Sequence, residues 1–129
     1  MTGSVLSGRF AYAAPATPPG ISGIAVIRMA GRSAFEIADE IFTAESSNGC
    51  AVSDMEPYTC AYGSVRDPVS AETADKVILT KFTAPHSYTG EDIVEFSCHG
   101  GIAARERILD ILYSRGARPA VPGEFTRNA

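Results

Sequence analysis

Residues 84–101, near the middle of the chain, are the part of the sequence that most constrains the fold. They begin as a turn, continue as a strand from Asp92 to His99, and end in two glycines that open a helix. In the alternating strand, Phe96 lies on an apolar face and Glu95 on the opposite one. Both histidines of the chain and three carboxylates fall in this stretch, and a plain core strand needs none of them. We therefore expect ligand chemistry here.

Residues 24–29 predict a second strand, because they form a continuous apolar run of strand length. With apolar residues on both faces, it is expected to be a central strand covered on both sides. Arg28 points to the same side as Ile24 and Val26. An arginine in this setting either pairs with a buried carboxylate or reaches a ligand.

Two helices are predicted. Residues 34–42 place apolar side chains at helical spacing after a capping box formed by Ser33 and Glu36. Residues 102–114 form the second helix, with a buried stripe that starts at Ile102, and Gly116 stands where a left-handed C-terminal glycine belongs.

The remaining segments predict a loop and further strands. Residues 15–23 hold three prolines and two glycines, which exclude a helix or a central strand. Residues 58–65 and 76–82 alternate as the two strands of an antiparallel hairpin, and short strands are expected at 10–14 and 117–121. This order of elements predicts an α+β fold with a mixed, mainly antiparallel sheet and two helices.

Length and composition narrow the class of protein. At 129 residues the chain is expected to be one domain, and its net charge of −4 argues against extended nucleic-acid binding by this piece alone. Three cysteines without a C-x-x-C pair make a disulfide framework or a structural zinc site improbable and suit a reducing cytoplasm. No apolar run approaches a signal peptide or a membrane span. We expect a soluble, cytoplasmic protein.

Glu95 is the most informative carboxylate, because Val94 and Phe96 flank it and an unsatisfied buried charge is costly. Its two oxygens can accept two parallel N–H bonds, an arrangement that suits an amino-heterocycle such as a pterin. The alternative is an internal salt bridge, with Arg28 as the partner. The sequence pattern favours neither.

The other reactive side chains of the stretch carry weaker signals. Cys98 and His99 are adjacent in a strand, so their side chains diverge and cannot form a nucleophile–base pair. A metal site built from His86, His99 and Glu95 lacks a fixed ligand spacing. Residues 87–92 are expected either to order a turn or to line a pocket or a subunit contact.

Several motifs in this order resemble the N-terminal domain of the MnmE (TrmE) family of tRNA-modification GTPases. They lie at residues 16–20, 23–31, 87–92, 99–101, 117–119 and 122–127, and the third reads Ser87-Tyr88-Thr89-Gly90-Glu91-Asp92. The resemblance implies a folate-binding domain similar to that of the glycine-cleavage aminomethyltransferase. It also implies that this domain dimerises and holds a tetrahydrofolate derivative, 5-formyl- or 5,10-methylene-tetrahydrofolate. The folate-contacting arginine and glutamate of the family correspond to Arg28 and Glu95.

The resemblance further implies a larger protein in which this domain has no catalytic residue of its own. Such a protein, a hydrolase, couples GTP hydrolysis to modification of the wobble uridine of tRNA, with an FAD-containing partner of the MnmG (GidA) type. The chain has no phosphate-binding loop of its own, so GTP and its magnesium or monovalent cation would belong to a missing GTPase domain. A lysine segment that contacts folate in the family would begin just after Ala129.

The expected organisation is a leader at residues 1–10, a folate-binding and dimerisation domain at 11–118, and the start of a linker at 119–129. The chain alone is expected to be an inactive fragment. Two alternatives stay open: a stand-alone folate-dependent enzyme of the aminomethyltransferase type, and a structural dimer module without a ligand. In the second alternative Arg28 and Glu95 would close on each other with no adjacent pocket.

Overall fold

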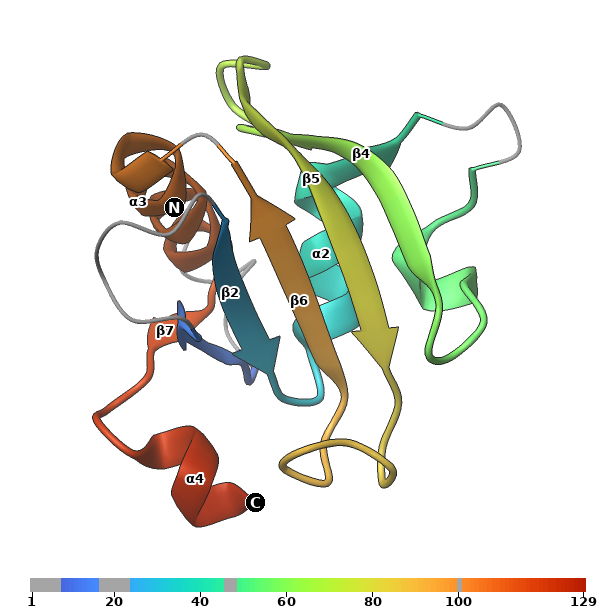
Figure 1. The fold of residues 1–129 in the computed structure, drawn as a ribbon, viewed down its shortest axis with the longest axis vertical. Coiled ribbons are helices and arrows are strands. Elements are labelled where there is room, and N and C mark those ends of the chain that lie inside the picture. The colour runs from blue at the N-terminus through green and yellow to red at the C-terminus, as the bar shows by residue number, and fades with distance from the viewer. Residues whose placement is uncertain (1–7, 17–23, 46–48, 100) are drawn as a thin grey trace.

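The computed structural model describes residues 8–16, 24–45, 49–99 and 101–129. These residues form one seven-stranded sheet in the order β3-β4-β5-β6-β2-β1-β7, in which only β1 and β7 run parallel (Figure 1). The α+β prediction with a mixed, mainly antiparallel sheet is confirmed. In chain order the elements are β1 (Tyr12–Pro15), β2 (Ala25–Ala30), α2 (Ala34–Ile41), β3 (Phe42–Ala44), the 3-10 helix η1 (Val52–Asp54), β4 (Cys60–Arg66), β5 (Thr73–Phe82), β6 (Ile93–Cys98), α3 (Gly101–Ser114), β7 (Arg118–Pro119) and α4 (Glu124–Asn128).

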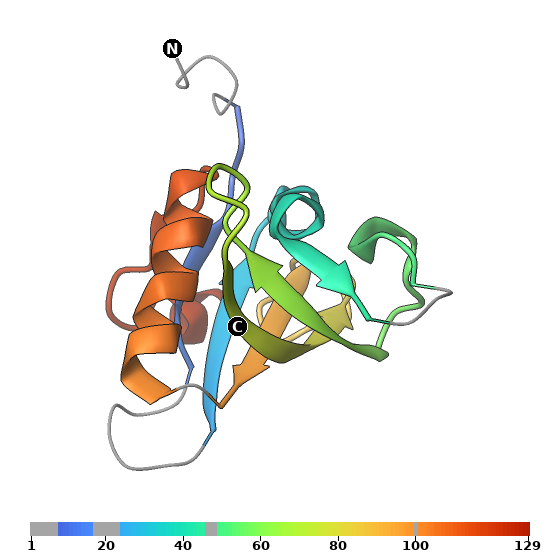
Figure 2. The ribbon, with the colours of Figure 1, turned by 90° about the horizontal axis from the view of Figure 1, so that it is seen from above.

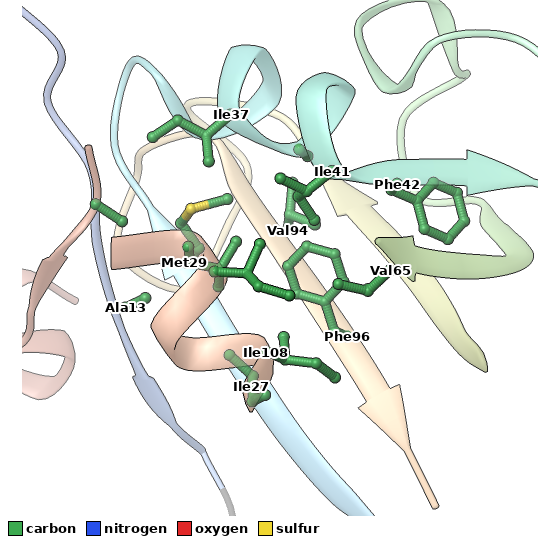
Figure 3. Packing of buried hydrophobic residues seen from close by; sticks show 14 of the residues in the cluster. Ala13, Ile27, Met29, Ile37, Ile41, Phe42, Val65, Val94, Phe96 and Ile108 are labelled. Carbon is green, nitrogen blue, oxygen red and sulfur yellow. The ribbon is translucent and has the colours of Figure 1, made fainter. Parts of the chain in front are cut away.

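Helices α2 and α3 pack on the same face of the sheet and contact each other (Figure 2). The core between the layers is apolar, with Ile27 and Met29 of β2 and Phe96 of β6 meeting Ile37 of α2 and Ile108 of α3 (Figure 3). Complete burial of a side chain as large as Phe96 stabilises the fold by about 2 kcal/mol.

The other face of the central strands is only partly covered. In β2, Ile27 and Met29 are buried whereas Val26 and Arg28 are half-buried. The prediction that this strand is covered on both sides is therefore wrong at Val26 and Arg28, and it holds only at Ala30, which is buried on that face in a second apolar cluster. An apolar run in the sequence does not reveal whether a second layer of helices exists, and here α2 and α3 share one face. The open face carries Arg28 and Glu95.

The predicted capping box at α2 is wrong. The Ser33 hydroxyl accepts the backbone N–H of Phe10 at 2.9 Å, and it makes no side-chain cap of the helix. Glu36 instead pairs with Arg9 at 3.2 Å. Phe10 and Arg9 of the N-terminal segment thus bind the two side chains that would form the capping box. A partner from elsewhere in the chain can replace a local cap when it satisfies the same donors and acceptors.

The chain segments assigned to a leader and a linker contact the folded domain. Arg9 donates to the Arg115 carbonyl at 2.6 Å and pairs with Glu40 of α2. Residues 118–119 add strand β7 to the edge of the sheet, and residues 124–128 form a helix, α4, that the sequence does not predict. Residues 1–7 and most of the predicted loop at 15–23 lie outside the described residues.

Helix α3 ends as predicted. Gly116 has a φ of 112°, and the N–H groups of Gly116 and Ala117 bond to the carbonyls of Tyr113 and Leu112, which is the Schellman pattern. The start of the predicted stripe is wrong, because Ile102 is 57% exposed and burial begins only at Ile108. Among the described residues, no helix is both long and apolar enough to span a membrane.

Candidate functional site

The sheet register brings Arg28 and Glu95 together. They are directly opposed on the antiparallel strands β2 and β6, on the face away from α2 and α3. The Nε of Arg28 donates to Oε2 of Glu95 at 2.8 Å, and the side chains are 24% and 22% exposed. The salt bridge that the sequence left as one of two alternatives is therefore present, and it stands at the surface of an open face.

Two aromatic rings flank the guanidinium of Arg28. Its Cζ lies 5.0 Å from the centroid of Tyr88 and 5.5 Å from that of Phe125. Both distances are within the range of a cation–π contact. Within the described residues, neither Nη of Arg28 nor Oε1 of Glu95 has a hydrogen-bond partner. As far as the described part of the chain is concerned, the pair therefore keeps donors and one acceptor for a further group.

A cleft of about 340 Å³ opens at this place. Arg28 and Tyr88 line it together with residues 14–16, at the end of β1, and residues 120–126, whereas Glu95 is not among its lining residues. In the ribbon, α4 and the loop between β5 and β6 lie at the same end of the sheet (Figure 1). Tyr88 belongs to the predicted loop at 87–92, and of the alternatives expected for that loop, lining a pocket agrees with the structure.

Ion pairing and ring packing hold residues 120–126 in place. The guanidinium of Arg118 donates to both carboxylate oxygens of Glu124, one of them at 2.9 Å, and the Val121 N–H donates to the same carboxylate at 3.0 Å. The ring of Phe125 packs at 5.0 Å on Tyr12. The hydrogen bond from Arg118 is the main reason why the pKa of Glu124 lies below its usual value.

Tyr12 is the buried centre of these contacts. Its hydroxyl donates to Oε1 of Glu91 at 2.5 Å and accepts from Nδ2 of Asn128 at 2.8 Å. Burial raises the pKa of Tyr12, and the hydrogen bond to Glu91 raises it further. The phenol therefore stays protonated near neutral pH and keeps its donor role.

The histidines and Cys98 take no part in this site. His86 and His99 are exposed, and no group of three or more His, Cys, Asp or Glu side chains in the described part of the chain could hold a metal ion. Cys98 is fully buried in the core, and burial raises the pKa of its thiol. A larger cleft of about 420 Å³ beside β4 is lined by Cys50 and Cys60, but neither Arg28 nor Glu95 borders it.

Sequence reasoning missed Phe125, Tyr12 and Asn128 as parts of the site. Phe125 lies in the segment assigned to a linker, although a glycine followed by Glu124 and an aromatic residue is compatible with a short helix. The bond from Asn128 to Tyr12 joins residues 116 positions apart. No local pattern reports such a contact.

Comparison with known proteins places the chain in a family. Residues 11–129 match the family model described as "GTP-binding protein TrmE N-terminus". The chain belongs to the TrmE N-terminal family. The match includes residues 119–129, in agreement with the folded wall of the cleft.

Full-length relatives of the TrmE family agree with this assignment. The "tRNA modification GTPase MnmE" of Moorella thermoacetica is 45% identical over 117 residues, which is 91% of this chain and 25% of the relative. The protein of the same name from Parabacteroides distasonis is 47% identical over 113 residues, 88% of this chain and 24% of the relative. The chain thus spans about a quarter of the length of these curated relatives.

Proposed function

We propose that this chain is the tetrahydrofolate-binding and dimerisation module of a cytoplasmic GTPase that modifies the wobble uridine of tRNA. Family membership supports the place of the module in such a protein. In this proposal GTP and its cations belong to a separate GTPase domain, and tRNA and an FAD-containing MnmG-type protein are partners of the whole enzyme. The module itself binds and positions the folate.

The observation that carries the folate proposal is that the Nη groups of Arg28 and Oε1 of Glu95 bond to none of the residues that the structure describes. Oε1 of Glu95 can accept an N–H from an amino-heterocycle, and the Nη groups of Arg28 can donate to a carbonyl or carboxylate. Tyr88, which is 51% exposed, has its ring 5.0 Å from the guanidinium, and Phe125 borders the same cleft. A pterin ring needs flat apolar surfaces together with paired donors and acceptors, so these residues suit the group.

The structural-module hypothesis has one observation in its favour. Arg28 and Glu95 do close on each other, as that hypothesis requires. It also requires that no pocket lies beside them, and a cleft of about 340 Å³ borders Arg28. We therefore keep ligand binding as the proposed role.

Dimerisation is supported by the family resemblance and by the open face of the sheet. Tyr62 and Ile78 are exposed and directly opposed on β4 and β5. Large apolar side chains on a free sheet face are a common component of protein interfaces. Light scattering after size-exclusion chromatography measures the oligomeric state, and a monomer at micromolar concentration would contradict this part of the proposal.

Calorimetry with 5-formyltetrahydrofolate tests the ligand. The titration should use the chain within the whole protein that carries it, next to Glu95→Gln and a distant exposed control, Glu72→Gln. We expect the Glu95 variant to weaken binding about tenfold or more, because a hydrogen bond to a charged group contributes about 1.5–3 kcal/mol, and the Glu72 variant to bind as the wild type does. Equal affinity of all three proteins would refute the assignment.

A further inference from the structure

Helix α4 depends on tertiary contacts for its position. It has five residues, begins after Gly123 with a φ of 80°, and has no side-chain cap. Helices this short do not persist alone in water. The ring of Phe125, the carboxylate of Glu124 and the amide of Asn128 therefore decide where it lies.

Phe125 connects α4 to Arg28. The same ring packs 5.0 Å from the Tyr12 ring and 5.5 Å from Cζ of Arg28, so it lies between the buried aromatic and the guanidinium. Any movement of α4 away from β1 removes one of the two rings that flank Arg28. The conformation of the guanidinium is thus coupled to the docking of α4.

The hydroxyl of Tyr12 determines which residue can occupy position 128. A phenol carries one proton, and here it is directed to Glu91, so the oxygen can only accept from its other neighbour. Asn128 satisfies this need by donating from Nδ2 at 2.8 Å. A carboxylate at this position has no proton to donate near neutral pH and would stand close to the negative charge of Glu91.

We propose that Asn128 is a positioning residue of the cleft: through its bond to Tyr12 it holds α4 against β1 and thereby keeps Phe125 over Arg28. The inference rests on the proposed function only where it predicts ligand affinity. The geometry of Arg28 can be measured without any ligand.

Modification by phenylglyoxal, which reacts with accessible guanidinium groups, provides the ligand-free test. Peptide mass spectrometry would follow the modification rate of Arg28 in the wild type, Asn128→Asp, Asn128→Ala and Phe125→Ala. We expect Asn128→Asp and Phe125→Ala to raise the rate at Arg28 about fivefold, and Asn128→Ala to raise it less, because alanine adds no charge. Arg107 on α3, which is already exposed, should react at an unchanged rate in every variant.

Val69→Asp is the matched control for charge. Val69 is 86% exposed in the turn between β4 and β5, so the substitution adds one negative charge far from α4. We expect wild-type reactivity of Arg28 in this variant. An Arg28 rate in Asn128→Asp that equals the rate in Val69→Asp would overturn the proposal.

Affinity for 5-formyltetrahydrofolate provides the second test. With α4 released, the dissociation constant of Asn128→Asp should rise about fivefold or more, whereas its melting temperature should match that of Val69→Asp. An unchanged dissociation constant together with faster modification would overturn the predicted effect of α4 on the ligand, and the positioning of Arg28 by Asn128 would stand. If the wild type binds no folate while the rate at Arg28 still rises in Asn128→Asp, the folate proposal fails and the positioning of Arg28 stands.

Discussion

The Arg28–Glu95 ion pair should contribute measurably to the stability of the sheet. Its two charged groups are directly opposed on β2 and β6, 2.8 Å apart, and about a quarter of each side chain is exposed. Exposed ion pairs contribute about 0.2–1 kcal/mol, and breaking a fully buried pair costs about 3–5 kcal/mol. For this intermediate exposure we expect a coupling free energy of about 1–2 kcal/mol between the two side chains.

A double-mutant cycle isolates this quantity. Urea unfolding of Arg28→Met, Glu95→Gln and the double variant gives three changes in the free energy of unfolding. Methionine keeps an aliphatic chain against Tyr88 and Phe125, so the cycle removes the charge and keeps most of the packing. The coupling should shrink in 1 M salt, where the Debye length falls to about 3 Å.

Additivity would refute the argument. If the single changes sum to the double change within about 0.3 kcal/mol, the two side chains do not interact energetically. A coupling that is unchanged by salt would also contradict an ionic origin.

Three further outcomes follow from packing and charge, each measurable by urea unfolding. Gly63→Ala should destabilise the protein by about 2 kcal/mol or more, because the new Cβ would lie 2.2 Å from the Thr43 carbonyl oxygen and would disrupt the pairing of β3 with β4. A decrease in the free energy of unfolding of less than about half this amount would contradict the steric argument. Lys81→Met should destabilise the protein by about 2 kcal/mol, because Lys81 is only 4% exposed and its ammonium donates to three carbonyls at the 3-10 helix η1. An unchanged free energy of unfolding would contradict this expectation. The hydrogen bond from Arg118 lowers the pKa of Glu124, so the contribution of this ion pair to the free energy of unfolding is complete above the unfolded-state pKa near 4.5 and is lost as the pH falls through the lower folded-state pKa. Glu124→Gln should remove this part of the pH dependence of stability. Identical pH profiles of the variant and the wild type would refute the expectation.

Local physics explains which elements could be predicted. The two-residue period of a strand placed Glu95 on the face opposite to Phe96 and Arg28 on the side of Val26, and a left-handed glycine after a helical run identified the end of α3 at Gly116. Both features depend only on neighbouring residues. The capping box at Ser33 failed for the opposite reason, because its hydroxyl is used by Phe10, which lies 23 positions earlier.

Contacts between residues far apart in the sequence also explain why Phe125, Tyr12 and Asn128 were not predicted as parts of the site. One wall of the cleft is made by residues 120–126, whose helix is too short to give a periodic signal. Its position is set by Tyr12, on the first strand of the sheet. The sequence could therefore single out Arg28 and Glu95 and offer their salt bridge as one of two alternatives, and it could not predict the rings and the buried phenol that surround them.

The closed Arg28–Glu95 pair can act on a ligand in two ways, and these predict opposite results. If the salt bridge competes with the ligand, Glu95→Gln frees the guanidinium and tightens the binding of an anionic group. If it holds Arg28 in place, the same substitution loosens the guanidinium and weakens binding. Among the residues that the structure describes, the hydrogen bonds of Arg28 involve only Nε, and a guanidinium has five N–H donors, so a ligand can bind without breaking the pair.

We therefore expect the second behaviour, which a comparison of two ligands can establish. Glu95→Gln should weaken the binding of 5-formyltetrahydrofolate and also that of p-aminobenzoylglutamate, an anion without the pterin ring. The loss of affinity should be smaller for p-aminobenzoylglutamate, because without a pterin ring this anion is affected only by the loosened Arg28. Tighter binding of p-aminobenzoylglutamate to Glu95→Gln would show that the pair competes with the ligand, and that Glu95 restrains Arg28 rather than positioning it.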